Sequence, residues 1–275
     1  MHKIFIFFLL ILFCFACSKE NIKISSINEK SLDLQVIEAY EEAMKSLNEG
    51  DVLFAAKKFN EAEIMFPQSP WAPKSALMAA YSYYSQDYYL DCIQELKRFV
   101  KVYPNHKHIS YAYYLLGISY YEQIVDEKKD LESIINAKET FKILNNKYPN
   151  TEYSLDAEFK LDLIDDILAS KEMYIGVYYQ KNKKWVAAIN RFKNIIENYE
   201  TTVYVEEALH RLVETNYNIG LVDEAEKYAN VLGYNYQSSE WYKKSYKIFN
   251  KNYQLSTDIK KDKEGVFKKF KKLFQ

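Results

Sequence analysis

An aromatic residue is followed by proline three times in this chain, each time in the same local context. The dipeptides begin at Phe66, Tyr103 and Tyr148, and each one ends an amphipathic stretch that is rich in alanine and aromatic residues. Proline cannot continue a helix, and it disfavours the helical conformation in the residue before it. A small residue lies twelve positions before each proline, and a larger apolar residue lies eight positions before it. These residues are Ala55, Cys92 and Ala137, and Phe59, Leu96 and Phe141. The chain therefore repeats a unit that ends with a helix.

This spacing is typical of the second half of a tetratricopeptide (TPR) repeat, which is a pair of antiparallel helices. The first half should carry a small residue about twelve positions upstream and then an aromatic one. Ala80 with Tyr83 fits this expectation. Two further units keep the spacing but carry Glu200 and Gln237 where the first three have proline. Five repeats then cover roughly Val36 to Tyr242.

The turns inside the repeats follow the same register. Gly50 and Gly220 lie five positions before the small residue of their units, where a helix that stops in a left-handed cap needs glycine. Small residues are expected to face each other within a helix pair, and aromatic side chains are expected to fill the space between successive pairs. In the third unit, the charged stretch 126–130 is expected to be an insertion between the two helices, where extra residues cost least.

The predicted fold class is all-α: an α-solenoid of about five TPR-like helix pairs with superhelical curvature. We assign residues 36–150 to repeats 1–3 and residues 151–250 to repeats 4–5. Six glycines, five prolines and the lack of sustained β-branched alternation leave little material for a sheet. A solenoid leaves a broad concave face open, and such a face is suited to binding other proteins.

The amino-terminal residues have the pattern of a secretory signal. A short basic head precedes twelve apolar residues, from Ile4 to Phe15. As a helix this run would be about 18 Å long, too short for a bilayer core of roughly 30 Å. Cys17 then resembles the end of a bacterial lipobox, in which the cysteine is lipidated. We assign residues 1–17 to a lipoprotein signal peptide with lipidated Cys17 at its end, and residues 18–35 to a flexible linker. An ordinary signal peptide without lipid is the alternative.

Catalytic chemistry finds no support in the sequence. Cys92 is the one cysteine left after removal of the signal and lipidation, so no disulfide is expected, and its position suits a small core residue. No histidine has metal-ligand spacing to a cysteine or carboxylate, and no glycine-rich phosphate loop is present. We expect no enzyme activity, no cofactor and no metal. The formal net charge of −1 argues against nucleic acid as a partner.

Four runs of residues share their composition and order with a known family. They are R-F-V-K-V-Y-P at 98–104, Y-A-Y-Y-L-L-G at 111–117, Y-P-N-T-E-Y at 148–153 and A-A-I-N-R at 187–191. Together with the lipidated cysteine, they resemble the BamD (ComL) family of outer-membrane assembly lipoproteins. The resemblance extends to about Tyr242.

The resemblance implies a non-enzymatic lipoprotein on the periplasmic face of the outer membrane. Such proteins work with the barrel subunit BamA and other subunits of the β-barrel assembly complex to fold and insert outer-membrane β-barrel proteins. The carboxyl-side repeats would dock the periplasmic POTRA domains of BamA. The amino-side repeats would form a pocket for an extended, aromatic-ended segment of an unfolded barrel protein. A generic TPR lipoprotein adaptor that recruits periplasmic peptidases or cell-wall enzymes is the alternative.

Carried over to this chain, the resemblance implies that Arg191 contacts a POTRA carboxylate. The chain has only three arginines, at 98, 191 and 211, and only arginine holds a carboxylate with two parallel hydrogen bonds. An intramolecular bridge is the alternative for Arg191, and it is the favoured role for the other two. Pocket candidates are tyrosines on the first helices of adjacent repeats, with core packing as the alternative for each. They are Tyr81, Tyr84, Tyr111 and Tyr114.

Residues 251–275 are a basic amphipathic tail. Its apolar residues fall at helical spacing, and lysines occupy the other positions. The apolar residues are Val266, Phe267, Phe270, Leu273 and Phe274, and the lysines are Lys260, Lys261, Lys263, Lys268, Lys269, Lys271 and Lys272. A solvated end, a helix on a partner and a helix on anionic lipid all fit this pattern.

Overall fold

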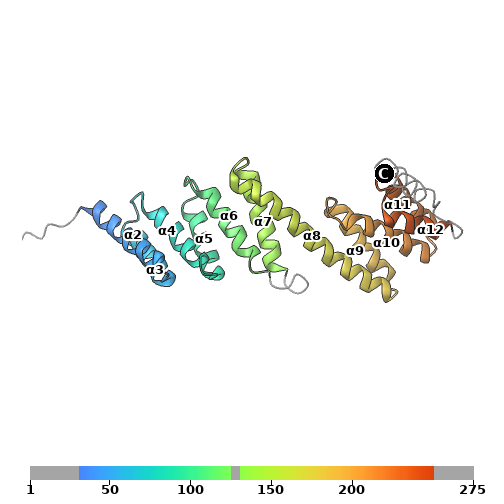
Figure 1. Ribbon diagram of the computed structural model, residues 1–275, viewed down its shortest axis with the longest axis horizontal. Helices are drawn as coiled ribbons and strands as arrows, with labels where there is room; N and C mark the ends of the chain where they lie inside the picture. Colours follow the sequence, from blue (N-terminus) through green and yellow to red (C-terminus); the bar gives the residue numbers. More distant parts are fainter. Residues whose placement is uncertain (1–30, 125–130, 251–275) are drawn as a thin grey trace, which may run out of the picture.

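A computed structural model describes residues 31–124 and 131–250, and this part of the chain contains eleven α-helices and no strand (Figure 1). The helices are α2 (Leu32–Asn48), α3 (Val52–Met65), α4 (Ala72–Tyr84), α5 (Tyr89–Val102), α6 (Ile109–Tyr121), α7 (Glu132–Lys147), α8 (Glu152–Lys181), α9 (Trp185–Asn198), α10 (Val205–Asn218), α11 (Val222–Asn235) and α12 (Glu240–Phe249). The predicted all-α fold class is confirmed.

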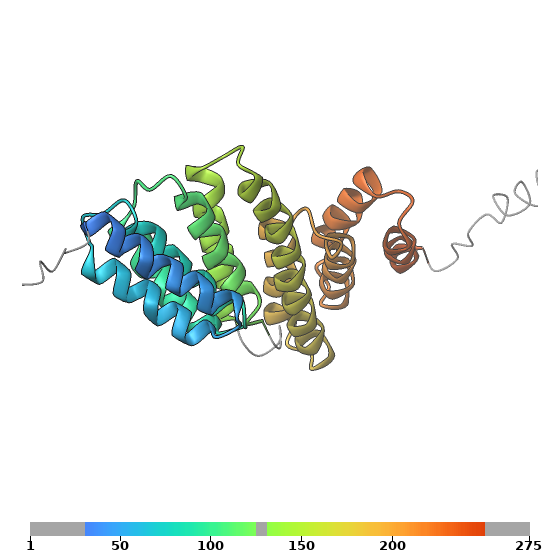
Figure 2. The same ribbon diagram turned by 60° about the vertical axis from the view of Figure 1, so that its left-hand side comes forward.

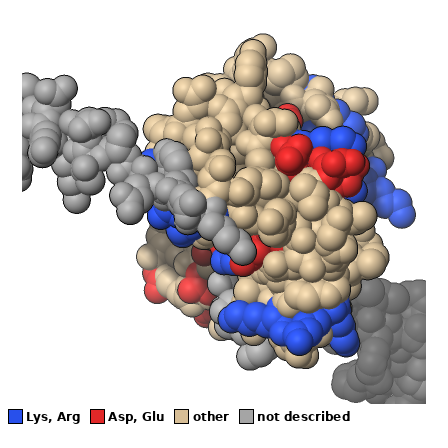
Figure 3. All heavy atoms as spheres, turned by 90° about the vertical axis from the view of Figure 1, so that its right-hand side faces the viewer, with Lys and Arg blue, Asp and Glu red and all other residues tan. Residues whose placement is uncertain are grey.

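The helices pack in five consecutive pairs, α2 with α3 through α10 with α11, and each pair packs on the next. Figures 1 and 2 show the pairs as successive layers of an elongated solenoid. Helix α12 follows the fifth pair and packs on α10 and α11. The repeat pattern did not predict it as a separate helix. Figure 3 faces this end of the molecule and shows mostly uncharged residues, with separate basic and acidic clusters rather than one broad field of a single sign.

The repeat register is confirmed by burial, although one expected contact is different. Ala55, Cys92, Ala137, Ala188 and Ala225 are all fully buried. The glycines of the first helices do not face small residues, however. A Cβ atom at Gly117 would lie 2.4 Å from the Phe141 ring, and one at Gly176 would lie 2.5 Å from the Phe192 ring. The aromatic residue therefore packs within its own helix pair, because glycine leaves room for the ring.

The second helix of every pair ends in the same conformation, with or without proline. The residues that follow these helices have φ between −122° and −138° and ψ between 44° and 57°. They are Phe66, Tyr103, Tyr148, Tyr199 and Tyr236. Proline is therefore not required for this helix end, because the two units with Glu200 and Gln237 in its place keep the same conformation.

The first helices also end alike. Gly50 and Gly220 both have φ of +86°, which confirms the predicted left-handed caps. Asp87 and Lys183 take the same position in repeats 2 and 4, with φ of +64° and +58°. These two residues adopt a conformation that is unfavourable for residues with a Cβ atom. We infer that the packing of the helices on either side imposes the turn.

Helix α8 joins the two halves of the solenoid. It has 30 residues and begins with a capping box in which Thr151 and Ser154 exchange side-chain and backbone hydrogen bonds. Ala157 and Ile164, in its first half, belong to one hydrophobic core with α4 to α7. Ala169 and Met173, in its second half, belong to a second core with α9 to α11. A single continuous helix thus connects the two cores.

Several assigned segments lie outside the described residues. These are the signal peptide with Cys17, the charged stretch 126–130 and the tail 251–275. The assigned linker, 18–35, lies mostly outside them, but α2 begins at Leu32, so its last part is helical.

Candidate protein-binding sites

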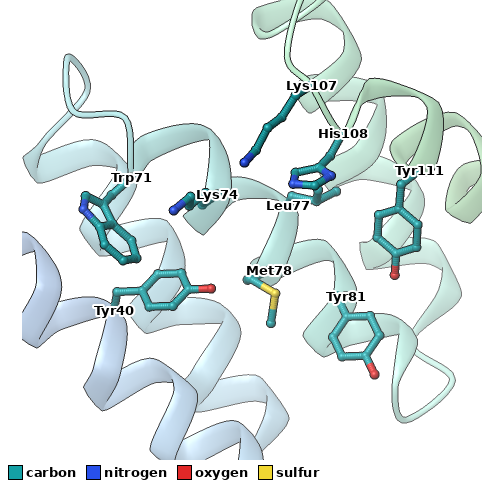
Figure 4. A pocket seen from close by; sticks show the side chains of 9 residues that line it. All are labelled: Tyr40, Trp71, Lys74, Leu77, Met78, Tyr81, Lys107, His108 and Tyr111. Atoms are coloured by element: carbon teal, nitrogen blue, oxygen red, sulfur yellow. The ribbon is translucent and has the colours of Figure 1, made fainter.

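A cavity of about 490 Å³ opens on the amino-side repeats (Figure 4). Side chains from α2, α4, α6 and the turns before α4 and α6 surround it. They are Tyr40, Trp71, Lys74, Leu77, Met78, Tyr81, Lys107, His108 and Tyr111. Figure 4 shows aromatic rings on both sides of the cavity and the two lysines near one edge. The cavity thus combines a large apolar lining with cationic groups at its edge.

The aromatic wall at the amino-terminal side is held in place by ring packing. The Tyr40 ring lies 5.0 Å from that of Trp71 and 5.2 Å from that of buried Phe59. The Lys74 ammonium lies 4.2 Å above the Trp71 ring, where the cation is attracted by the ring face. These contacts fix the indole before any ligand arrives.

The structure divides the four candidate tyrosines into two groups. Tyr81 and Tyr111 line the cavity, and burial raises the pKa of the Tyr111 hydroxyl, which therefore stays protonated. Tyr84 packs on the Tyr89 ring, at 5.8 Å. Tyr114 donates a hydrogen bond of 2.8 Å to Asp156 on α8. Neither Tyr84 nor Tyr114 lines the cavity, and both are partly buried against the core.

Sequence reasoning missed several residues of this cavity, among them Tyr40, Trp71, Lys107 and His108. Tyr40 lies on the first helix of the preceding repeat, and so it could have been found by extending the tyrosine argument to α2. Trp71, Lys107 and His108 lie in turns between helices. The helical periodicity that selected the tyrosines contains no information on where turn residues point.

A second hollow, of about 530 Å³, lies between α8 and α9 around Arg191. The Arg191 Nη1 donates to both carboxylate oxygens of Glu172, at 3.0 and 3.1 Å. The Arg191 side chain is 42% exposed, whereas that of Glu172 is 16% exposed. Among the described residues, Nε and Nη2 of Arg191 have no hydrogen-bond partner. The intramolecular bridge is therefore present, and it leaves two nitrogens of the guanidinium available on a partly exposed side chain.

The other two arginines are satisfied within the fold. Arg98 binds Glu63 through both Nη atoms and Glu95 through Nε and Nη2. Arg211 binds two carboxylates of its own helix and lies 5.6 Å from the Trp241 ring. The structural role favoured for these two residues is confirmed.

Chemically reactive groups are few in the described part of the chain. Cys92 is fully buried beside Ser119, at 3.3 Å, and burial raises the pKa of its thiol to about 11. It is therefore a protonated core residue.

No group of three or more metal-ligating side chains occurs among the described residues. Across residues 31–124 and 131–250, each helix is too short or too polar to span a lipid bilayer.

These observations define a TPR-type helical-repeat protein with an aromatic cavity on its amino-side repeats and an arginine hollow between α8 and α9. Comparison with known protein families gives a specific match. The model of the YfiO family, described as outer membrane lipoprotein, matches residues 32–232. The chain belongs to this family.

Curated relatives agree over most of their length. The outer membrane protein assembly factor BamD of Rickettsia prowazekii is 43% identical over 214 residues, which covers 75% of this chain and 85% of the relative. BamD of Caulobacter vibrioides is 41% identical over 213 residues, covering 78% of this chain and 70% of the relative. BamD of Neisseria gonorrhoeae is 33% identical over 187 residues, covering 64% and 70% respectively.

Proposed function

We propose that this protein is a non-enzymatic scaffold of outer-membrane β-barrel assembly, anchored to the periplasmic face of the outer membrane by lipid on Cys17. It binds the POTRA domains of BamA through its carboxyl-side repeats and unfolded barrel proteins through its amino-side repeats. Family membership and the assembly-factor relatives support the general role. The observation that supports the division of labour is that the two sites are built on different repeats. The aromatic cavity lies on α2, α4 and α6, whereas the arginine hollow lies between the second half of α8 and α9.

The arginine hollow suits a carboxylate on the partner. Glu172 fixes the Arg191 guanidinium from one side, and the remaining donors are directed away from that bond. A second carboxylate can approach without displacing the first, because the guanidinium has five N–H donors in a fixed fork. A charge pair at an interface also sets the register of docking.

Replacing Arg191 by glutamate is expected to lower the amount of BamA that co-purifies from detergent-solubilised envelopes by about tenfold or more, since a like charge would face the partner carboxylate. Lys193→Glu is the matched control, because Lys193 lines the same hollow and undergoes the same change of charge. Circular dichroism of both variants should match the parent protein. Equal recovery of BamA with Arg191→Glu and the parent would remove Arg191 from the interface.

The amino-side cavity suits an extended peptide that ends in an aromatic residue. Its rings offer flat apolar area, and its hydroxyls offer hydrogen bonds to a peptide backbone. Lys74 and Lys107 lie where they can pair with a carboxylate of the peptide.

A photo-crosslinking amino acid at Tyr81 is expected to form adducts with a synthetic carboxyl-terminal peptide of a barrel protein, because Tyr81 lines the cavity and is 38% exposed. The same group at Tyr84 should give several-fold less adduct, because Tyr84 lies outside the cavity and packs on Tyr89. Adduct mass is read by mass spectrometry. Equal yields at the two positions would show that the peptide binds elsewhere.

Depletion separates this function from that of a generic adaptor for peptidases or cell-wall enzymes. Loss of an assembly scaffold should lower all outer-membrane barrel proteins together, because they share one insertion route. Loss of an adaptor should leave their levels unchanged, and that result would overturn the proposed function.

A further inference from the structure

The first half of α8 has an exposed face that is both apolar and acidic. Leu155, Phe159 and Leu163 are 57%, 70% and 48% exposed. Glu158 and Asp162 are exposed between them. Spacings of three and four residues place all five side chains on one side of a helix. We call these five residues the α8 stripe.

The length of α8 explains why this face is open. The helix has 30 residues, whereas α9 has 14. Helix α9 shares a core with the second half of α8. The first half of α8 shares a core with α6 and α7 instead (Figure 1). Single exposed apolar residues are ordinary, but three in line on one helix are a patch of the kind that marks an interaction surface.

The charges of this face also lack partners. Glu158 and Asp162 form no ion pair with any described residue. Asp166 follows one turn later, and its Oδ1 atom is buried without a hydrogen-bond partner among the described residues. Lys160, the one lysine in this half of the helix, lies 5.1 Å above the Tyr121 ring. The chemistry of the stripe therefore calls for a ligand that is both apolar and basic.

We propose that the chain's own tail, residues 251–275, docks on the α8 stripe. The tail lies outside the described residues, but its sequence has the complementary composition. Phe267, Phe270 and Phe274 recur at spacings of three and four, which would place them on one side of a helix, as the four-residue spacing of the stripe places its apolar residues. Lys268 and Lys271 lie next to these apolar positions in the sequence, and their charge is opposite to that of Glu158 and Asp162.

The tail is long enough to reach this surface. Helix α12 packs on α10, α10 packs on α9 and α9 packs on α8. Three interhelical spacings, together with about 15 Å along α8 from Met173 to Leu163, amount to roughly 45 Å. The segment 251–265 precedes the aromatic part of the tail, and an extended segment of this length spans up to about 50 Å. Docking ties the carboxyl-terminal end of the solenoid back to its central helix.

A photo-crosslinking phenylalanine analogue at Phe159 tests this contact in the full chain, purified in detergent. The expected adduct joins position 159 to residues 259–275 of the same chain, with a yield that does not depend on protein concentration. The matched control places the analogue at Val203, which is 78% exposed in the turn before α10 and outside the stripe. That position should give no adduct with the tail.

Charge reversal tests the chemistry of the contact. Lys268→Glu with Lys271→Glu should lower the adduct yield about fivefold, because each exposed ion pair contributes a factor of about two to five. Adding Glu158→Lys and Asp162→Lys should restore the yield. The proposal is overturned by adducts that join two chains, or by an adduct yield that the charge-reversing substitutions leave unchanged. It is equally overturned if no adduct forms and the tail instead floats the protein with phosphatidylglycerol vesicles.

Discussion

Replacing Arg98 by methionine is expected to lower the free energy of unfolding by about 3 kcal/mol, because it leaves a buried carboxylate without its partner. The Glu63 side chain is only 7% exposed. It accepts hydrogen bonds from Nη1 and Nη2 of Arg98, at 2.7 and 2.6 Å, and from the Tyr103 hydroxyl, at 2.7 Å. Burial and the bond to Glu63 raise the pKa of Tyr103 to about 12, so the phenol remains a donor. The cluster joins α3 to α5 and thereby the first repeat to the second.

The double variant Arg98→Met with Glu63→Met separates the cost of the unpaired charge from the net contribution of the pair. We expect it to recover most of the lost stability, because apolar side chains of similar volume can replace a buried ion pair at little cost. Chemical denaturation followed by circular dichroism measures both variants. A double variant as unstable as the single one would mean that the loss comes from packing or from the lost bond to Glu95, not from the orphaned Glu63.

Residues that recur with the repeat could be predicted from the sequence, because packing in a solenoid imposes the same geometry on every unit. The burial of Phe59 and Phe141 and the caps at Gly50 and Gly220 follow from spacing alone. The contact partner of each residue did not follow, because spacing locates a residue on a helix without identifying the ring that faces it. Gly117 therefore meets Phe141 of its own pair and not a small residue.

The candidate sites were predicted in part, for a related reason. Tyr81 and Tyr111 lie on helices whose inner face is set by the repeat. Tyr114 lies on the same helix as Tyr111, but its hydroxyl is bound to Asp156 of α8, and the repeat pattern of a single unit cannot predict a contact with the next unit. For Arg191 the intramolecular bridge does not exclude the partner contact, because one amino group binds Glu172 while the side chain as a whole is 42% exposed.

Acid is expected to destabilise the carboxyl-terminal end of the solenoid through His210. This side chain lies on α10 and is buried, and its Nδ1 is 2.9 Å from the Ser245 hydroxyl of α12. Its ring also packs on Trp241 of α12, at 5.2 Å. Burial lowers the pKa of His210 from 6.5 to about 4; the positive charges of Arg211 and Lys244 add to this shift, and Glu214 opposes it. The imidazole is therefore neutral in the folded state, and its protonation would place a positive charge in the interface between α10 and α12.

The sign of the pH dependence follows from these two pKa values. Above about pH 6.5 both the folded and the unfolded chain carry neutral His210, and the full stability is present. As the pH falls from 6.5 towards 4, only the unfolded chain takes up the proton. The free energy of unfolding therefore drops by about 3 kcal/mol, because each unit of difference between the two pKa values corresponds to about 1.36 kcal/mol. Because α12 is the last described helix and packs mainly on α10 and α11, this helix should detach before the rest of the solenoid unfolds.

His210→Gln is the matched control, because glutamine can bond to Ser245 but does not titrate in this range. Hydrogen exchange of the α12 amides, followed from pH 7 to pH 4 and corrected for intrinsic rates, should show loss of protection in the parent protein. The glutamine variant should retain it down to the range in which carboxylates titrate. The difference between the two proteins isolates the histidine from those carboxylates. If α12 keeps equal protection in both proteins at pH 4, the buried imidazole does not control the docking of this helix.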